Sequence, residues 1–227
     1  MAYVVSVPNK HFQLYTNDAL KAEFDRFYES HFGKQELTFA LLYGFPYGIR
    51  FEIGMGEVYD ETYIKNGVAR GRAIFDALFG KTDRVYVVVN SFEDDPNDLA
   101  DNDISTLRPL VQDVIGECKF VFSSTEDEEL TFTRYVIKAL VKDIQVDKLL
   151  EEIMWSDIDG RNSLRGCVYL INPRNAVIYR LYDDRGLDVI ASEKSQLVEV
   201  YSRFNSWILD YDRAKIDEVY TCSEVQL

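Results

Sequence analysis

The stretch CVYLINPRNAVIYRLYDDRGLDVIA, residues 167–191, decides the fold class. Its two apolar, β-branched runs at 167–171 and 176–182 predict strands. Residues 172–175, Asn-Pro-Arg-Asn, have the composition of a hairpin turn. A third short strand is predicted at 187–191, after the tight turn Asp-Asp-Arg-Gly at 183–186. The stretch therefore predicts consecutive strands joined by turns, without an intervening helix.

The segments upstream add further strands. Residues 84–90, Arg-Val-Tyr-Val-Val-Val-Asn, are β-branched and bounded by polar residues, which is typical of a strand. The apolar runs 37–43 and 49–55 flank Gly-Phe-Pro-Tyr-Gly, so they predict a hairpin. A strand is also predicted at 119–122. Residues 130–141 fit either a helix or a strand, and their aromatic and threonine content favours a strand.

Helices are predicted where apolar residues recur at helical spacing. The first begins near Asn17 and closes at Gly33. The second covers residues 62–79, capped by Asp60 or Thr62, and its Gly67 and Gly71 indicate that another element approaches closely. A third covers 147–155. A last helix is expected to start at a Ser192 cap and to bury residues as far as Tyr211.

Strands in hairpins mixed with helices predict an α+β fold with a mixed or antiparallel sheet, helices packed on the sheet and a C-terminal helix. We expect residues 1–227 to form a single compact unit, because no Gly/Ser/Pro-rich linker interrupts the chain. A division into 1–125 and 126–227 is the alternative.

The C-terminal third also carries a family resemblance. The segments 168–172 and 178–190, followed by Tyr201, Phe204-Asn205 and residues 207–209, resemble a bacterial family known only as domain of unknown function 3885. Its most specific piece is Tyr-Asp-Asp-Arg-Gly-x-Asp at 182–188. Arg50-Phe51-Glu52 and the helix at 69–79 extend the resemblance over most of the chain, and residues 157–160 depart from it. The resemblance implies a bacterial or phage origin and a shared fold, and no activity.

Composition narrows the function classes. The chain of 227 residues has a formal net charge of −14, which disfavours nucleic acid as a partner because binding requires Lys and Arg to neutralise phosphates. The three cysteines are far apart and only two histidines occur, so neither a disulfide framework nor a metal site is expected. No cofactor signature occurs. No signal peptide or membrane span is predicted, and we expect a cytoplasmic protein.

Acidic clusters supply the first candidate site. An acidic protein steers basic partners toward it, although such a charge also serves solubility alone. One cluster lies at 93–103 and a second at 126–129. We expect the first to bind a basic protein, as an immunity or inhibitor protein would, through Asp94, Asp95, Asp98, Asp101 and Asp103.

The 182–188 motif supplies the second candidate. Its carboxylates are the ligand type of a divalent cation, but a structural turn is favoured because Asp and Gly are common turn residues. The motif residues are Tyr182, Asp183, Asp184, Arg185, Gly186 and Asp188. An enzyme site near Arg50, Glu52 and this turn is the alternative to a binding role, and a structural subunit of an assembly is a third. Cys167, at the head of an apolar strand, is interpreted as a small core residue.

Overall fold

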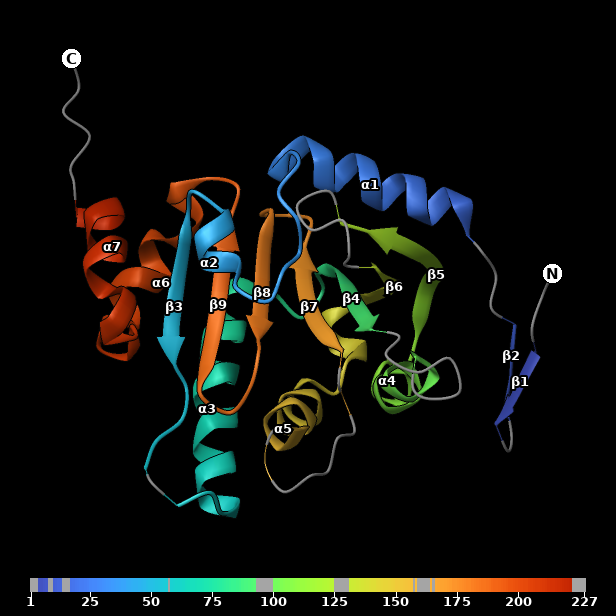
Figure 1. Cartoon of the computed structure of the whole chain (residues 1–227), viewed down its shortest axis with the longest axis horizontal. Coiled ribbons are helices and arrows are strands. Elements are labelled where there is room, and N and C mark those ends of the chain that lie inside the picture. The colour runs from blue at the N-terminus through green and yellow to red at the C-terminus, as the bar shows by residue number, and fades with distance from the viewer. Residues whose placement is uncertain are drawn as a thin grey trace.

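The computed structural model describes residues 4–7, 10–13, 17–56, 58–92, 100–124, 131–156, 158, 164 and 166–221 (Figure 1). Of these, the residues before 17, residue 92 and residues 100–103 are described by their backbone alone. Among the described residues, the first two strands, β1 (Val4–Val7) and β2 (Lys10–Gln13), pair only with each other.

Within the described part of the chain, the main sheet has seven strands, and every neighbouring pair in it is antiparallel. Its strands interleave segments from both halves of the chain. From one edge to the other they are β3 (Gly48–Glu52), β9 (Gly186–Ala191), β8 (Val177–Leu181), β7 (Cys167–Asn172), β4 (Arg84–Phe92), β6 (Thr131–Leu140) and β5 (Val114–Ser123).

Helices cover both faces of this sheet (Figure 1). One face carries α1 (Asp18–Phe32) and the short α2 (Leu41–Gly44), and the other carries α3 (Glu61–Leu78) and α5 (Val146–Ser156). At the β3 edge lie α6 (Val198–Arg203) and α7 (Asp210–Thr221), whereas α4 (Ala100–Leu107) precedes β5. No helix in the described part of the chain is both long and apolar enough to cross a bilayer.

Two apolar cores result from this layering. Because strand side chains alternate between faces, the odd-numbered valines of β4 join the α3 and α5 core, while Tyr86 and Val88 join the core under α1. The α+β prediction is confirmed, and so are the C-terminal hairpins and the strand at 84–90. Residues 131–140 form β6, so the choice of a strand there is also confirmed.

Helices α1 and α3 begin at the predicted caps. The Leu20 amide donates to the Asn17 side chain at 3.0 Å. Before α3, the amides of Thr62 and Tyr63 both donate to Asp60 at 2.9 Å. These bonds satisfy amides that a helix start otherwise leaves without a partner.

The predicted hairpin of 37–43 with 49–55 is wrong. Residues 41–44 form α2, and β3 pairs with β9 instead of with its upstream neighbour. The reason is burial: Leu41 and Phe45 point into the core under α1, so this segment covers the sheet rather than extending it. Register with the distant β9 gives β3 a fully buried partner strand that a local hairpin would lack.

Two other boundaries differ from prediction. The helix expected from Ser192 to Tyr211 is broken into 3-10 turns at Lys194–Leu197 and Asn205–Trp207, with α6 between them and α7 after them. The break lets Ile208 bridge to Phe51 and the Leu209 amide donate to the Arg50 carbonyl at 3.0 Å. Part of the expected acidic loop, from Ala100 onward, is helical in α4.

The glycine pair of α3 allows the close approach that the sequence indicates. A side chain at Gly67 would meet the end of Met154 on α5. At Gly71 the Tyr179 hydroxyl from β8 donates to the glycine carbonyl at 3.0 Å. Both glycines therefore let α3 pack directly on α5 and on the sheet.

Candidate functional site

Three charged side chains form a row across one face of the sheet. Arg50 on β3 pairs in register with Asp188 on β9, and Asp188 pairs in register with Arg180 on β8. All three are buried, with Asp188 fully enclosed. Burying charge is costly unless each group finds a partner, so this row is the most unusual feature of the core.

Arg50 has every partner that a buried guanidinium needs. Its Nε and Nη2 donate to the two carboxylate oxygens of Asp188 at 2.6 and 2.8 Å. Its Nη1 donates to Asp212 on α7 at 3.2 Å and to the Tyr43 hydroxyl at 3.2 Å. The hydrogen bonds to Asp188 raise the pKa of Arg50 against the lowering effect of burial. Arg50 therefore meets the 182–188 segment through Asp188.

Arg180 is different, although it is only 3% exposed. Its Nη1 donates to the Phe39 carbonyl and its Nη2 lies 3.3 Å from the Cys167 sulfur. Its Nε has no hydrogen-bond partner, and among the described residues no carboxylate lies at ion-pair distance from it. Asp188, its register neighbour, instead accepts hydrogen bonds from Arg50 at both carboxylate oxygens. The charge of Arg180 is therefore buried without a counter-charge in contact.

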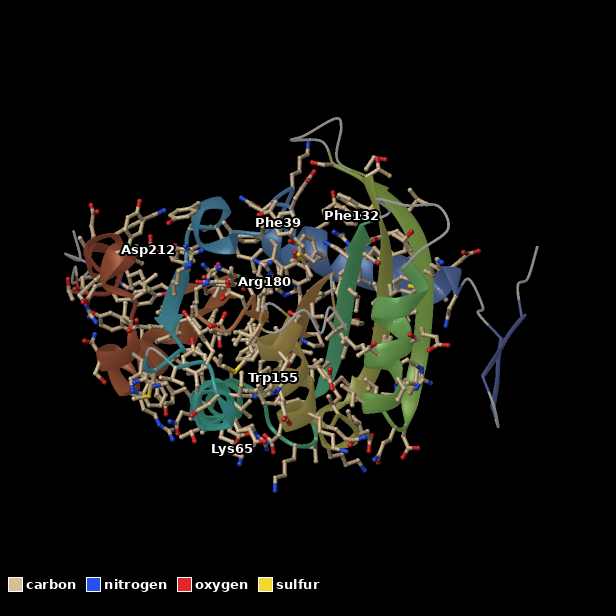
Figure 2. The ribbon with its side chains drawn as sticks, turned by 60° about the horizontal axis from the view of Figure 1, so that its bottom comes forward. Phe39, Lys65, Phe132, Trp155, Arg180 and Asp212 are labelled. Atoms are coloured by element: carbon tan, nitrogen blue, oxygen red, sulfur yellow. The ribbon has the colours of Figure 1, made fainter. Side chains whose placement is uncertain are left out.

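Arg180 lines a pocket of about 390 Å³. Figure 2 shows Arg180 in the interior of the molecule with Phe39 beside it. The described lining combines apolar walls with a few polar groups: Phe39, Ile153, Ser156, Leu164, Gly166, Cys167, Val168, Arg180, Leu181, Tyr182, Asp183 and Arg185. Burial raises the pKa of Tyr182 to about 12, so its hydroxyl stays protonated at neutral pH. The pocket thus offers donors and a positive charge.

The Asp-Asp-Arg-Gly segment forms a tight turn at the pocket rim. Asp183 accepts from the backbone amides of Arg185 and Gly186 at 2.8 and 3.2 Å, and it also pairs with the Arg185 side chain. Asp184 accepts from the Tyr63 hydroxyl at 2.6 Å, which with burial raises the pKa of Tyr63. Each carboxylate in this turn already has its own donors.

A second buried arginine lies on the same face of the sheet. Arg134 on β6 donates from Nε to Asn90 at 2.8 Å and stacks its guanidinium over Phe122 at 4.1 Å. Its Nη2 has no partner within the described residues. Burial lowers the pKa of Arg134. Arg134 does not belong to the lining of the Arg180 pocket, so it serves as a comparison for Arg180.

The residues named from sequence lie in different places. Asp94, Asp95 and Asp98 lie outside the described residues, as does the cluster at 126–129. Asp101 and Asp103 lie in α4, where only the backbone is described. Glu52 is exposed at the end of β3, opposite Gly186 in the register. Within the described part of the chain, no three His, Cys, Asp or Glu side chains gather as a metal site.

Sequence reasoning missed Arg180 as a candidate. The signal was present, since an arginine stands inside the otherwise apolar strand Val177–Leu181. A single charge within a buried strand is rare without a partner or a function. What the sequence could not show is that Asp188 pairs with Arg50 and leaves Arg180 facing a pocket.

Comparison with known proteins places the chain in a family. A profile described as Domain of unknown function (DUF3885) matches residues 24–212. The chain is also similar to the uncharacterized protein YnaE of Bacillus subtilis (strain 168), with 22% identity over 167 residues that cover 68% of this chain and 74% of that protein. No solved structure matches. The chain belongs to the family described as Domain of unknown function (DUF3885).

Proposed function

We propose that this protein binds a small organic anion in the pocket beside Arg180. The observation that carries the proposal is the buried guanidinium of Arg180, which has no carboxylate partner among the described residues and lines a pocket. An anionic ligand would supply the missing counter-charge. Because the site is shielded from water, a charge-assisted hydrogen bond there is strong.

The pairing of Arg50 with Asp188 shows how the guanidinium of Arg180 can bind an anion. In Arg50, the edge formed by Nε and Nη2 holds both oxygens of a carboxylate. In Arg180, the same edge meets only the Cys167 sulfur, at Nη2. A ligand carboxylate or phosphate in the pocket can accept hydrogen bonds from the Arg180 guanidinium alongside the Cys167 sulfur. The formal net charge of −14 repels anions in general, so binding here would depend on this local positive charge.

The walls indicate the rest of the ligand. The pocket of about 390 Å³ lies at the small end of ligand sites, which span about 300–1,000 Å³. Leu164, Val168 and Leu181 supply apolar surface, and Phe39 supplies an aromatic ring. A small anion with an apolar or aromatic portion satisfies both the charge and these walls.

Thermal unfolding with matched probes tests the proposal. Benzoate and the neutral benzamide have nearly the same shape and differ in charge, so at equal ionic strength only benzoate should raise Tm. A ligand at about ten times its Kd stabilises by about 1.4 kcal/mol, or about 3–6 °C for a chain of this size. In Arg180→Met the benzoate effect should vanish, and in Arg72→Gln, on the exposed face of α3, it should remain. Equal shifts with benzamide would refute the proposal.

A second function rests on the chain's charge. A basic protein partner, as in an immunity or inhibitor role, is supported by the formal net charge of −14. A pull-down at low and physiological salt, with Asp94, Asp95 and Asp98 changed to Asn in a matched variant, tests it. A basic partner that is lost with salt and with the variant supports docking. If no partner is captured at either salt concentration, the net charge serves solubility alone.

A further inference from the structure

Cys167 shares the guanidinium edge of Arg180. Its sulfur lies 3.3 Å from Nη2, and its side chain forms part of the pocket wall. The thiol is not in a disulfide. A guanidinium in contact with a sulfur stabilises the thiolate form, which is the nucleophilic form of cysteine. The same pocket therefore holds a positively charged anchor and a sulfur nucleophile side by side.

We propose that Cys167 is a nucleophilic thiol that forms a covalent bond with small organic anions carrying an electrophilic carbon next to the carboxylate. The inference rests on the anion-binding function proposed above and adds a reaction to it. The ligand carboxylate pairs with the guanidinium of Arg180 where this residue lines the pocket. Its neighbouring carbon then lies beside the Cys167 sulfur, because that sulfur lies 3.3 Å from Nη2 of the same guanidinium.

The charge balance of this reaction fits the pocket. The thiol first loses its proton to solvent, and the thiolate electron pair forms a sulfur–carbon bond while the leaving group departs with the electrons of its own bond to carbon. The sulfur ends as a neutral thioether. The ligand carboxylate then remains as the only anion in contact with Arg180, which gives the buried guanidinium the counter-charge that it lacks.

Cys118 provides a reference within the same chain. It is also buried, on β5, and burial raises its pKa to about 11; no arginine among the described residues is in contact with its sulfur. It does not belong to the lining of the Arg180 pocket. A reagent that reaches thiols through general unfolding would modify both cysteines, whereas a reagent that enters the pocket would modify Cys167 alone.

Alkylation with a matched reagent pair tests the proposal. Iodoacetate is an anion and iodoacetamide is its neutral counterpart, and each transfers its carbon to sulfur with release of iodide. We expect Cys167 in the intact chain to react at least about tenfold faster with iodoacetate, as a charge-assisted hydrogen bond in the transition state implies. Peptide mass spectrometry gives the rate at Cys167 and at Cys118 separately. Benzoate should slow only the reaction at Cys167.

Variants separate charge from packing. Arg180→Lys keeps the charge but not the fork, so the preference for iodoacetate should shrink, and Arg180→Met should abolish it. Arg72→Gln should leave the rates at Cys167 unchanged. The protection by benzoate needs only the wild-type chain, so the test holds even where an Arg180 variant fails to fold.

The outcomes distinguish the two proposals. If Cys167 reacts no faster than Cys118 with either reagent while benzoate still raises Tm, the nucleophile is refuted and the anion site stands. If Cys167 reacts rapidly but without preference, and benzoate neither protects it nor raises Tm, both proposals fail. A preference for iodoacetate together with protection by benzoate supports both.

Discussion

At the scale of single residues, the two arginines that flank Asp188 differ in what faces them. Asp188 accepts both hydrogen bonds from Arg50 and leaves Arg180 to the Phe39 carbonyl and the Cys167 sulfur. A carboxylate shared evenly would have neutralised each guanidinium in part. The uneven pairing instead concentrates an uncompensated charge at the pocket wall, where a ligand can use it.

Asp188→Asn should be strongly destabilising. Among the described carboxylates, the change leaves Arg50 with Asp212 alone, and it adds net positive charge beside Arg180. Breaking a buried ion pair on one side costs about 3–5 kcal/mol. Urea unfolding measures this loss, with Asp76→Asn in the exposed Arg72 pair as the control, for which we expect less than about 1 kcal/mol. Equal losses in the two variants would contradict the account of the buried row.

Only part of the candidate site could be predicted at this scale. The sequence points to Asp188 through the 182–188 motif and to Arg50 beside Glu52, but their contact spans 138 positions and depends on the pairing of β3 with β9. Local pattern carries no information on that pairing. Cys167 is in the core, as its apolar strand indicates, yet its contact with Arg180 arises only from the register of β7 with β8.

At the scale of elements, α3 packs closely on α5 and on the sheet, and its Tyr63 hydroxyl donates to Asp184 in the 182–188 turn. Gly67 lets Met154 of α5 lie against the helix backbone, and α5 in turn contributes Ile153 to the pocket. The close approach to α3 could be predicted from the sequence, because two glycines inside a helix lower its stability unless packing offsets the loss. The sequence could not predict which element approaches.

Gly67→Val should loosen this packing. The new side chain would overlap Met154 and approach Ile53, and overfilling a packed core costs about 1–3 kcal/mol. Gly44→Ala is the matched control, since a methyl group there meets nothing within 4 Å. Thermal melts of both variants check the prediction. A neutral Gly67→Val would show that α3 and α5 have room to separate.

The attachment of α1 should depend on pH. Hydrogen bonds from Lys138 at 2.5 Å and Tyr86 at 2.6 Å lower the pKa of Glu23 below its usual value, against a raising effect of burial. A lowered pKa in the folded state means stability that is present above the unfolded pKa of about 4.3 and is lost as pH falls through the folded pKa. The difference in urea stability between wild type and Glu23→Gln should be largest at about pH 6 and should shrink as pH falls below the unfolded pKa of about 4.3. If the difference in stability between the two proteins stays constant over this pH range, the ion pair of Glu23 with Lys138 does not contribute in the predicted way.

At the scale of the whole molecule, the sheet joins strands that are far apart in sequence. The α+β class was predictable because hairpin turns and helical spacing are local signals. The order β3-β9-β8-β7-β4-β6-β5 was not, because it depends on which strands bury each other best. The error at 37–43 follows from the same limit, since Leu41 joins a core under α1 that no local pattern describes.

The net charge of −14 also acts on the whole molecule. Repulsion of anions by the surface should weaken as salt rises, while contact with the buried Arg180 is screened less. Benzoate binding should therefore change little or strengthen modestly as sodium chloride is added. Binding through exposed lysines and arginines would instead weaken steeply with salt. Titrations at several salt concentrations separate the two.

The most direct test of the anion site is a nitrogen–proton correlation spectrum of the arginine side chains during a benzoate titration. The Nε–H signal that disappears in Arg180→Lys belongs to the group that has no hydrogen-bond partner among the described residues. We expect this signal to shift and saturate with benzoate, to stay in place with benzamide, and to move more than the signal of Arg50, whose Nε already donates to Asp188. If the Arg180 signal does not move, or all arginine signals move alike, the pocket beside Arg180 is not an anion site.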